Sequence, residues 1–588
     1  MNTEWKLDDF FYEGVNDRAI MDDVDSYVRS VDDFTVKYQN RISNLSYDAF
    51  LEYLGDWSNL GMVIEKISMY LGLAMSLNTQ DQGLQKLAKK LQKIGAECSE
   101  KLVFIQEANK MMGYDRLISL SQKKEFERYK NFLVNEANSL KYLLDETEES
   151  LLIKSDQASE ENIYEELTSV FEFPFKGEML TQDEVRSKRE SPNRNERAEA
   201  VRSMGSVFGS QERQIVFGNL YALVCKANVF DKEIRGYDSV LSSRNESEQI
   251  SDQAVDTLIG SVTKKYPYFH TFLEKKRRVL GLETMEFHDV LAPIDDLDQE
   301  KLTFEKGWSM FMDVIKKADP LQHEFMNSML NEGRISVYPR NGKSTGAFAN
   351  YGAFTKEFMM LNWADSPNDV TTLAHEAGHC IHGHLSKVQD PLVYHTPLTL
   401  AETASIFNET LMFEELIKNV DPERKSAMIM ARLDDIFSTI FRQIAYIRFE
   451  RRCHEAFERN EPMTYEDFNA AWLEEFALLF GPNVKLNENE VSPLWSSVPH
   501  IFQTPFYCYT YAFGNIISLN LVQQYKQAED KVDFMKKYHN FLAAGGSERP
   551  EDLLMSIFGL KIDEQFYETA LRNIVELMEM VDETEIAA

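Results

Sequence analysis

Residues 372–386 read TLAHEAGHCIHGHLS, and this segment constrains the fold of the chain more than any other. It contains four of the eleven histidines, and His375, Glu376 and His379 form an HExxH motif. Two imidazoles four residues apart lie one turn apart on one face of an α-helix, close enough to bind one metal ion. Glu376 lies beside that face, where it can reach a metal-bound water without being a ligand. The segment therefore predicts a helix that carries a metal site.

The residues around the motif support this helix. Ser366, Pro367 and Asp369 have the pattern of a helix start, with a capping serine, a proline in the first position and an acid in the third. Apolar residues recur at helical spacing on the side away from the motif, at Val370, Ala374, Ala377, Ile381 and Leu385. We expect this apolar stripe to face a core and the histidine face to line a cleft.

The third metal ligand must come from another segment, because a catalytic zinc takes three protein ligands and keeps one position open. A metzincin would place a histidine at position 385, where this chain has Leu385. The other route takes a glutamate from a second helix, and we expect one to begin at Thr396 and Pro397. Glu402 and Glu409 lie on the polar face of that helix. Glu402 is the predicted ligand, and Glu409 is predicted to support a ligand or to face solvent.

Three further histidines lie near the motif. His382, one turn after His379, is predicted to line the cleft or to support the ligands, and a ligand role is the alternative. His384 lies near the apolar stripe, where a buried and hydrogen-bonded imidazole is expected. The role of His395 stays open.

The remainder of the chain is predicted to be mainly α. Segments such as 84–111 and 423–452 show helical periodicity, and only 16 prolines occur in 588 residues. The polar stretch 187–200 suggests a boundary between an N-terminal helical domain, 1–195, and a second domain, 196–588, that carries the metal site. Residues 333–363 are rich in glycine and aromatic residues and predict a small β-sheet with an edge strand at 357–363.

The charge of the chain limits its partners. A formal net charge of −33 argues against nucleic acid or an anionic membrane, because phosphate groups are bound by clustered Lys and Arg. The sequence shows no uncharged apolar run of about 18 residues and no signal segment at its start. The five cysteines form no CxxC pair. We expect a soluble, cytoplasmic protein without a membrane partner, and the sequence leaves open whether it is a monomer or a homo-oligomer.

HEAGH followed by LAETAS resembles the thimet oligopeptidase-like zinc metallopeptidases, and the oligoendopeptidase F branch is the most similar. The resemblance runs along nearly the whole chain, through WKLDDFF, RGYDSVLSSR, GLETMEFHDVLAPI, VYPRNGKSTGAF and AAGGSERPEDLL in that order. It implies an almost all-helical fold of the gluzincin type. Two helical halves would flank a deep substrate channel with zinc at its floor, and the small β-sheet would lie next to the HExxH helix.

The resemblance also implies roles for individual residues. It assigns one zinc ion per chain to His375, His379 and Glu402, with Glu376 as the catalytic base. Near the C-terminus it implies three further catalytic residues: Tyr507 and Tyr511, which would stabilise the oxyanion, and His500, which corresponds to the histidine that accompanies them. Ser336 and Ser344 depart from the family pattern, which affects the expected substrate preference and leaves the zinc chemistry intact.

Peptide substrates are expected to contact the small sheet and its glycine-rich loop. An extended peptide would pair with the edge strand 357–363 while the loop 342–348 closes over it, because glycines allow close backbone approach. A purely structural hairpin is the alternative. The predicted substrate-binding residues are Gly346, Ala347, Phe348, Met359 and Met360.

These features predict a zinc-dependent oligoendopeptidase that hydrolyses internal bonds of short unfolded peptides, with a zinc-bound water activated by Glu376. A helical HExxH zinc carboxypeptidase is the first alternative, and the lengths of the products separate the two reactions. A non-catalytic peptide-binding protein is the second, although such a protein would not need Glu376. A structural zinc site is the third, and it would need a fourth ligand such as His382.

Overall fold

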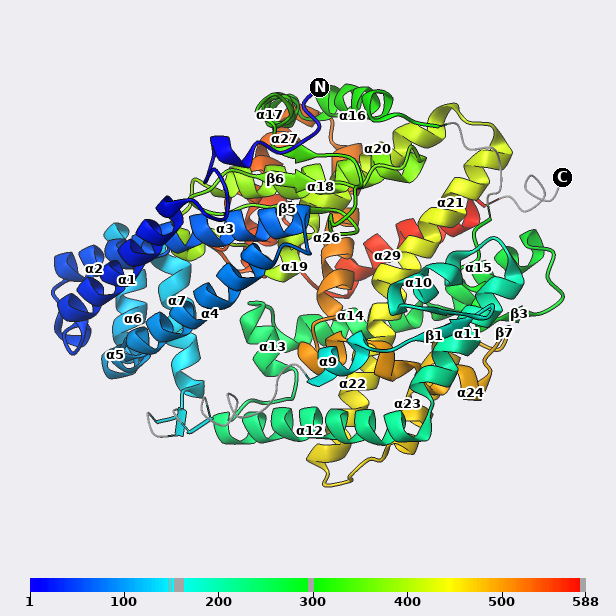
Figure 1. The fold of residues 1–588 in the computed structure, drawn as a ribbon, viewed down its shortest axis with the longest axis horizontal. Helices are drawn as coiled ribbons and strands as arrows, with labels where there is room; N and C mark the ends of the chain where they lie inside the picture. Colours follow the sequence, from blue (N-terminus) through cyan, green and yellow to red (C-terminus); the bar gives the residue numbers. More distant parts are fainter. Residues whose placement is uncertain (146–147, 150, 153–162, 295–300, 582–588) are drawn as a thin grey trace. The chain divides into compact units, whose positions relative to one another are not determined.

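The computed structural model describes residues 1–581 apart from 146–147, 150, 153–162 and 295–300, and it is built mainly from helices (Figure 1). The predicted mainly α fold is confirmed. The chain forms two compact units. Unit 1 comprises Met1–Leu143, Gln299–Glu415 and Leu521–Leu560, and unit 2 comprises Leu144–Asp298, Leu416–Asn520 and Lys561–Ala588. The proposed division at residue 195 lies inside unit 2 and, like the substrate channel, stays a prediction.

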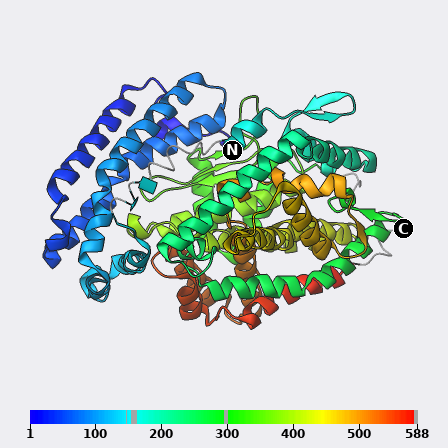
Figure 2. The ribbon, with the colours of Figure 1, turned by 90° about the horizontal axis from the view of Figure 1, so that it is seen from below.

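The first stretch of unit 1 is a group of helices that lie side by side, coloured blue in Figures 1 and 2. Its longer helices begin at side-chain caps, such as Asp17 before α1 and Ser46 before α2. Apolar residues such as Phe34, Tyr53 and Leu117 form a core between them. The helices are α1 (Arg18–Tyr38), α2 (Tyr47–Leu60), α3 (Met62–Leu77), α4 (Gln82–Leu102), α5 (Phe104–Met112), α6 (Tyr114–Ser121) and α7 (Lys130–Ser139).

Within the described part of the chain, one helical stretch, Tyr47–Leu77, is long and apolar enough to cross a membrane when judged by length and composition alone. It consists of α2 and α3, which meet at Gly61. Both helices also bury residues in cores of unit 1, among them Phe50 and Ile67. A single stretch of this kind is weak evidence for a membrane span, and the absence of a membrane partner stays a prediction.

The other two stretches of unit 1 surround the HExxH segment. Their helices are α16 (Phe304–Ala318), α17 (Pro320–Asn331), α18 (Pro367–Ser386), α19 (Leu398–Ala401), α20 (Thr403–Leu416), the end of α26 (Tyr509–Gln527), α27 (Lys531–Ala543) and α28 (Pro550–Phe558). The strands β4 (Ile335–Ser336), β5 (Phe348–Asn350) and β6 (Phe358–Met360) form one small sheet. β5 and β6 pack against α18, so the predicted sheet next to the HExxH helix is confirmed (Figure 1).

The predicted edge strand at 357–363 is wrong, because β6 is the middle strand of this sheet. β6 runs parallel to β4 on one side and antiparallel to β5 on the other. Met359 pairs with Ile335 and Ala349, and Met360 pairs with Ser336 and Phe348. Both methionines are fully buried. A continuous apolar strand of this kind is typical of a position that is covered on every side.

Unit 2 is also helical. Its helices are α9 (Ile163–Ser169), α10 (Gln182–Ser187), α11 (Arg194–Phe208), α12 (Gln211–Arg235), α13 (Ser242–Ser247), α14 (Asp252–Lys264), α15 (Tyr266–Val279), α21 (Pro422–Ile436), α22 (Arg442–Glu458), α23 (Tyr465–Phe480), α24 (Glu488–Val491), α25 (His500–Gln503), the start of α26, and α29 (Glu564–Glu579). Strands β1 (Phe173–Phe175) and β2 (Glu178–Leu180) pair antiparallel, and β3 (Met285–Glu286) and β7 (Val484–Lys485) pair parallel.

The polar stretch 187–200 is a packed part of unit 2. It forms a 3-10 helix, η5 (Lys188–Glu190), and the start of α11. Arg194 and Arg197 bond to the buried carboxylate of Asp289 at 2.7 and 3.0 Å. Its polar composition suggests a linker, but its two arginines form hydrogen bonds with a residue about ninety positions further along the chain.

A buried carboxylate connects the sheet of unit 1 to α18. Glu357, just before β6, is 1% exposed. It accepts from Arg334 at 3.0 Å, forms an ion pair with Lys387 at 2.6 Å, and lies 3.3 Å from Nδ1 of His384. Burial raises the pKa of Glu357, but the bonds to His384 and Lys387 outweigh it and hold the pKa at about 2. The sheet and the end of α18 are thereby fixed to each other.

We expect Glu357→Gln to lower the free energy of unfolding by about 3–5 kcal/mol, because it leaves two cations without their buried counter-ion. Glu332→Gln removes an exposed partner of the same arginine and should cost less than about 1 kcal/mol. The lowered pKa means that the contribution of Glu357 is complete above about pH 5 and is lost as the pH falls toward about 2. Urea unfolding across this range measures both effects, and equal losses in the two variants would contradict them.

Candidate metal centre

The helix α18 begins where the sequence predicts. Ser366 caps Asp369, and the carboxylate of Asp369 in return accepts from the N–H of Ser366 at 2.8 Å. The apolar stripe is also confirmed, because four of its residues are buried and Leu385 is partly buried: Val370, Ala374, Ala377 and Ile381. His375 and His379 are partly exposed on the other face. The rigid helix therefore presents both imidazoles on one side.

Gly378, inside the HExxH motif, allows α18 to approach α20 closely. A Cβ atom at this position would lie 2.3 Å from the carbonyl oxygen of Ala404 and 2.5 Å from the Cα atom of Ser405. Cβ atoms do not approach other atoms so closely, so any larger residue would displace α20. The glycine thus brings the chain around Glu402 to the histidine face of α18.

The second helix of the site is interrupted, whereas the sequence predicts a continuous one. α19 ends at Ala401, and Glu402 stands between α19 and α20 with φ −82° and ψ 1°. Its carbonyl oxygen accepts from the N–H of Ile406, so α20 starts afresh from Glu402. Its carboxylate accepts from the hydroxyl of Ser405 at 2.7 Å. The break places the carboxylate at the start of a helix, where that hydroxyl holds it.

The three predicted ligands converge. Oε2 of Glu402 lies 3.4 Å from Nε2 of His375 and 3.5 Å from Nε2 of His379. Among the described residues these three form a group whose donor atoms all lie within 4.8 Å of one another. Ligand atoms about 2.0–2.1 Å from a tetrahedral zinc are about 3.4 Å apart. Two imidazole nitrogens and one carboxylate oxygen at this spacing fit a divalent ion with one position open.

Glu409 contacts the first predicted ligand, and its supporting role stays a prediction. Nδ1 of His375 donates to Oε2 of Glu409 at 3.0 Å. Because a carboxylate only accepts, a proton lies on Nδ1, which leaves Nε2, the atom that faces Glu402, as the one that a metal ion would bind. Burial lowers the pKa of His375, but the hydrogen bond to Glu409 and the two nearby carboxylates raise it to about 9. The carboxylates around His375 therefore favour a positive charge at this position.

Glu376 is set apart from the ligands. It is 6% exposed, and its Oε2 atom has no hydrogen-bond partner among the described residues. The backbone N–H of Ala349 in β5 bonds to the carboxylate. Burial raises the pKa of Glu376, against the opposing influence of His379 and His375. A buried carboxylate with a free oxygen beside two metal-binding imidazoles is suited to accept a proton.

The three other histidines near the motif differ in their surroundings. His382 is buried, its Nδ1 has no partner among the described residues, and burial lowers its pKa to about 3. Its role stays a prediction. The expectation that His384 is buried is wrong, because its ring is exposed, stacks on Phe325 and pairs with Glu357. His395 is exposed and contacts Tyr394, and its role stays open.

The edge of the sheet near Glu376 belongs to β5. The N–H of Met359 bonds to Arg334 on the β4 side, so the pair of Met359 and Ala349 makes no hydrogen bonds to each other. The N–H and C=O of Ala349 therefore point to the open edge, where the N–H reaches Glu376. Main-chain pairing of a peptide with Met359 and Met360 is excluded, because both neighbours of β6 are already in place.

The buried amine of a lysine fixes the start of the glycine-rich loop through hydrogen bonds to backbone carbonyl groups. Nζ of Lys343 donates to the carbonyl oxygens of Leu361 at 2.6 Å and Tyr338 at 2.9 Å. Burial lowers the pKa of Lys343 to about 8. The N–H of Ser344 bonds to the carbonyl of Ser76 in α3. The loop with the predicted substrate residues Gly346, Ala347 and Phe348 is thus fixed at its start, and their role stays a prediction.

The three predicted residues near the C-terminus lie together in unit 2. The ring of His500 stacks on that of Tyr507 with centroids 5.6 Å apart, and Tyr511 meets Tyr507 edge-on at 5.2 Å. Burial lowers the pKa of His500, which favours the neutral imidazole. The metal ligands lie in unit 1. The catalytic roles of these three residues stay predictions.

Glu450 was not identified from the sequence, although it holds the segment before Tyr507. Phe506 has φ 62°, an unfavourable backbone conformation for a bulky residue. Its N–H donates to Oε2 of the fully buried Glu450 at 2.8 Å. Burial raises the pKa of Glu450 to about 8. A glutamate between Phe449 and Arg451 of α22 is a weak sequence signal, and its partner lies 56 residues away.

Comparison with known proteins identifies relatives over most of the chain. Residues 188–573 match the sequence model of the family described as Peptidase family M3. The chain is 27% identical over 549 residues to the oligoendopeptidase F homolog of Borreliella burgdorferi, covering 90% of this chain and 91% of that protein. It is 25% identical over 567 residues to oligopeptidase PepF of Bacillus subtilis, covering 94% and 82%.

The fold is similar to solved structures of low sequence identity. A protein from Chlamydophila abortus has a TM-score of 0.85 at 21% identity, covering 99% of this chain and 98% of that one. Oligoendopeptidase F from Enterococcus faecium has a TM-score of 0.69 at 19% identity, covering 95% and 98%. Trypanosoma cruzi metallocarboxypeptidase 1 has a TM-score of 0.51 at 12% identity, covering 94% and 99%. At these identities the likeness concerns the fold alone.

We expect Glu409→Gln to weaken zinc binding by about 10- to 100-fold, because the hydrogen bond to His375 loses its charge. Glu414→Gln, on the same helix but paired with Lys526 at the surface, should leave the affinity unchanged. Competition between the metal-free protein and a chelating dye measures both affinities. Identical affinities for Glu409→Gln and the unmodified protein would show that Glu409 does not support the metal.

Proposed function

The chain belongs to peptidase family M3 and is a metalloendopeptidase, and we propose that it is a zinc-dependent oligoendopeptidase that hydrolyses internal bonds of short, unfolded peptides. The observation that carries this proposal is the convergence of His375, His379 and Glu402, with the buried Glu376 beside them. The proposed metal is zinc, because the donor set and its spacing match a tetrahedral catalytic site with an open position.

Each residue of the centre has a distinct proposed task. His375, His379 and Glu402 hold the ion, and Glu409 fixes the tautomer and the orientation of His375. When bound, zinc supplies Lewis acidity, which lowers the pKa of water and polarises a carbonyl group. The gathering of carboxylates around the two imidazoles offsets the positive charge that such an ion brings.

Glu376 is the proposed general base and then the general acid. Its free oxygen would take a proton from the attacking water and pass it to the leaving amine of the scissile bond. Burial raises the pKa of Glu376, which brings it closer to the range in which a group both accepts and releases a proton. The bond from Ala349 keeps the carboxylate oriented between the ligands and the edge of β5.

Tyr507 is the proposed donor to the oxyanion, with Tyr511 and His500 beside it. A phenol stays protonated at neutral pH and can donate to developing negative charge. The hydroxyl of Tyr507 has no hydrogen-bond partner among the residues that the structure describes, so it is available to a substrate. The family resemblance supports the role, and the contact of the three rings supports their acting together.

The edge of β5 is the proposed place of the substrate backbone. Extended peptides add to exposed sheet edges through main-chain hydrogen bonds. The open groups of Ala349 lie beside Glu376, and Gly346, Ala347 and Phe348 lead into the same edge. A folded protein cannot offer an extended backbone there, which is why we propose unfolded oligopeptides as substrates.

A zinc carboxypeptidase is the alternative reaction that a test has to distinguish. The fold is shared with Trypanosoma cruzi metallocarboxypeptidase 1, so the architecture alone does not separate the two reactions. Removal of single C-terminal residues and cleavage at internal bonds give different products. The lengths of the fragments therefore decide between the candidates.

The first test is mass spectrometry of a mixed-length peptide pool after incubation with the zinc-loaded protein. We expect internal cuts in short peptides, and their loss in Glu376→Gln by about a thousandfold or more, because the base is removed while the ligands remain. Glu332→Gln serves as the matched control with full activity. Zinc content must be equal in all three proteins. Single-residue trimming would establish the carboxypeptidase, and no cleavage would reject both enzymes.

A second test concerns the oxyanion donor. We expect Tyr507→Phe to lower kcat by about 10²–10³-fold with little change in KM, because the hydroxyl acts on charge that develops in the transition state. Tyr509→Phe is the matched control in the same segment, since its buried hydroxyl has no partner among the described residues. Equal kcat values for the two variants would remove Tyr507 from the mechanism.

A further inference from the structure

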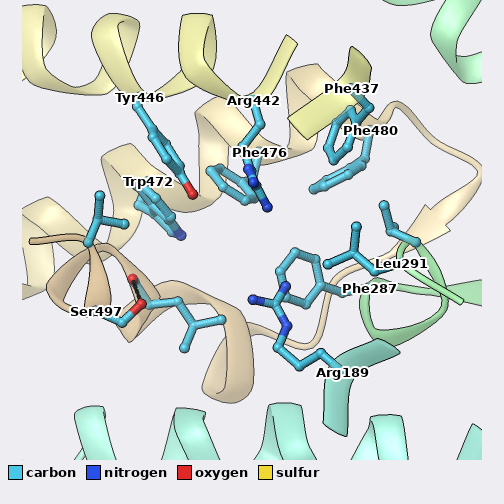
Figure 3. Close-up of a pocket in the computed structure, with 13 residues that line it drawn as sticks. Arg189, Phe287, Leu291, Phe437, Arg442, Tyr446, Trp472, Phe476, Phe480 and Ser497 are labelled. Carbon is cyan, nitrogen blue, oxygen red and sulfur yellow. Dashed lines mark hydrogen bonds between the residues drawn. The ribbon is translucent and has the colours of Figure 1, made fainter. Parts of the chain in front are cut away.

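Unit 2 contains a pocket that the metal centre does not use (Figure 3). It is partly open, and the space within it and at its mouth amounts to about 430 Å³, part of which is open solvent. Most of its wall is apolar, with aromatic residues such as Phe287, Phe476 and Phe480. The polar lining comes from Arg189 of η5, from Arg442 and Tyr446 of α22, from Trp472 of α23, and from Ser497.

The polar groups that face this pocket are mainly hydrogen-bond donors. Trp472 is 2% exposed, and its indole N–H has no partner among the described residues. The Nε atom of Arg442 is buried and equally without a partner. Buried donors without acceptors are rare in folded proteins, because no hydrogen bond within the protein compensates for their loss of hydration. Two such donors at one cavity indicate a ligand that offers hydrogen-bond acceptors.

The two guanidinium groups point into the same space from opposite walls (Figure 3). Neither forms a hydrogen bond or an ion pair with another residue in the part of the chain that the structure describes, although Arg189 lies over the ring of Phe287. No Asp or Glu lines the pocket. Burial and the charge of Arg442 lower the pKa of Arg189 to about 10. Two like charges without a counter-ion are unfavourable, and a bound anion would neutralise them.

A backbone irregularity positions one of these groups. Residues Phe437–Phe441 form a single π-helical turn, η9, between α21 and α22. Arg442 follows directly after it, and Phe437 lies in the pocket wall. A π turn rotates the side chains that follow it relative to a regular α-helix, and such turns are rare and frequent at functional sites. Here the turn directs Arg442 inward from a helix that would otherwise be continuous.

We propose that this pocket binds a small organic carboxylate, whose carboxylate group lies between Arg189 and Arg442 and whose apolar body packs against Phe287, Phe476 and Phe480. Guanidinium groups bind carboxylates through paired, planar hydrogen bonds, and the N–H of Trp472 can donate to the same group. An inorganic anion would leave the aromatic wall facing water, which is why the ligand should carry an apolar part. The site is independent of the peptidase activity proposed for the metal centre.

Isothermal titration calorimetry of the full chain with 3-phenylpropanoate tests the proposal. We expect saturable binding, and no binding of the neutral 3-phenylpropanamide. Arg189→Gln and Arg442→Gln should each weaken binding by about tenfold or more, because a charge-assisted contact is lost. Arg452→Gln, on the exposed side of α22 and paired with Glu474, should have no effect. Carboxylate binding at the metal would persist in both pocket variants and would therefore count against the proposal.

Thermal unfolding separates ligand binding from a structural role of the arginines. Arg442→Gln should keep or raise the Tm of the free protein, because it removes repulsion, and should abolish the rise in Tm that 3-phenylpropanoate produces. A lowered Tm with unchanged affinity would show that Arg442 only supports the fold. Absence of binding to the unmodified protein, equal affinity for the amide, or tighter binding of inorganic phosphate than of 3-phenylpropanoate would each overturn the proposal.

Discussion

The metal centre depends on the close contact between α18 and the chain that follows Glu402. Two of the proposed ligands come from one helix and the third from a break before another, so the distance between the helices sets the distance between the donor atoms. At Gly378 a single methyl group would lie 2.3 Å from the carbonyl oxygen of Ala404. On the other side of α18, a Cβ atom at Gly383 would lie 2.4 Å from the ring of Tyr351. Two glycines therefore determine how closely the surroundings approach this helix.

Buried polar contacts then fix the sheet relative to that helix. Glu357 connects β6 and Arg334 to the end of α18, and Lys343 binds the carbonyl oxygens at the end of the sheet. Such groups contribute little net stability, because desolvation opposes their attraction. Their effect is positional, since each loses its partner if the sheet shifts. The position matters because β5 carries the N–H of Ala349, which bonds to Glu376.

The sequence predicts those parts of the site that depend on neighbours along the chain. The cap at Ser366, the apolar stripe and the two imidazoles of α18 each involve residues three or four positions apart, so their spacing in the sequence reveals them. Glu402 was predicted because it lies one short loop further on, but the break at that residue depends on packing against Gly378. Strand order was missed because β4, at the start of the same segment, pairs with β6 instead of with β5, which follows it in the sequence, and this makes β6 the central strand. The hydrogen bond between Phe506 and Glu450 joins residues far apart in the sequence, so no local pattern predicts it.

The proposed metal centre and the arginine pocket both gather groups of one charge, and the sign of that charge differs between them. Around His375 the chain collects acceptors and negative charge, which are incomplete without a cation. Around Arg442 it collects donors and positive charge, which are incomplete without an anion. The second arrangement is the less expected one in a chain with a net charge of −33, because most of the surface repels anions. Two backbone elements place these unpaired arginines. The π turn of η9 directly precedes Arg442, and η5 carries Arg189 on the facing wall. The repulsion between the two arginines lowers the stability of the free protein, and a carboxylate bound between them would offset this loss.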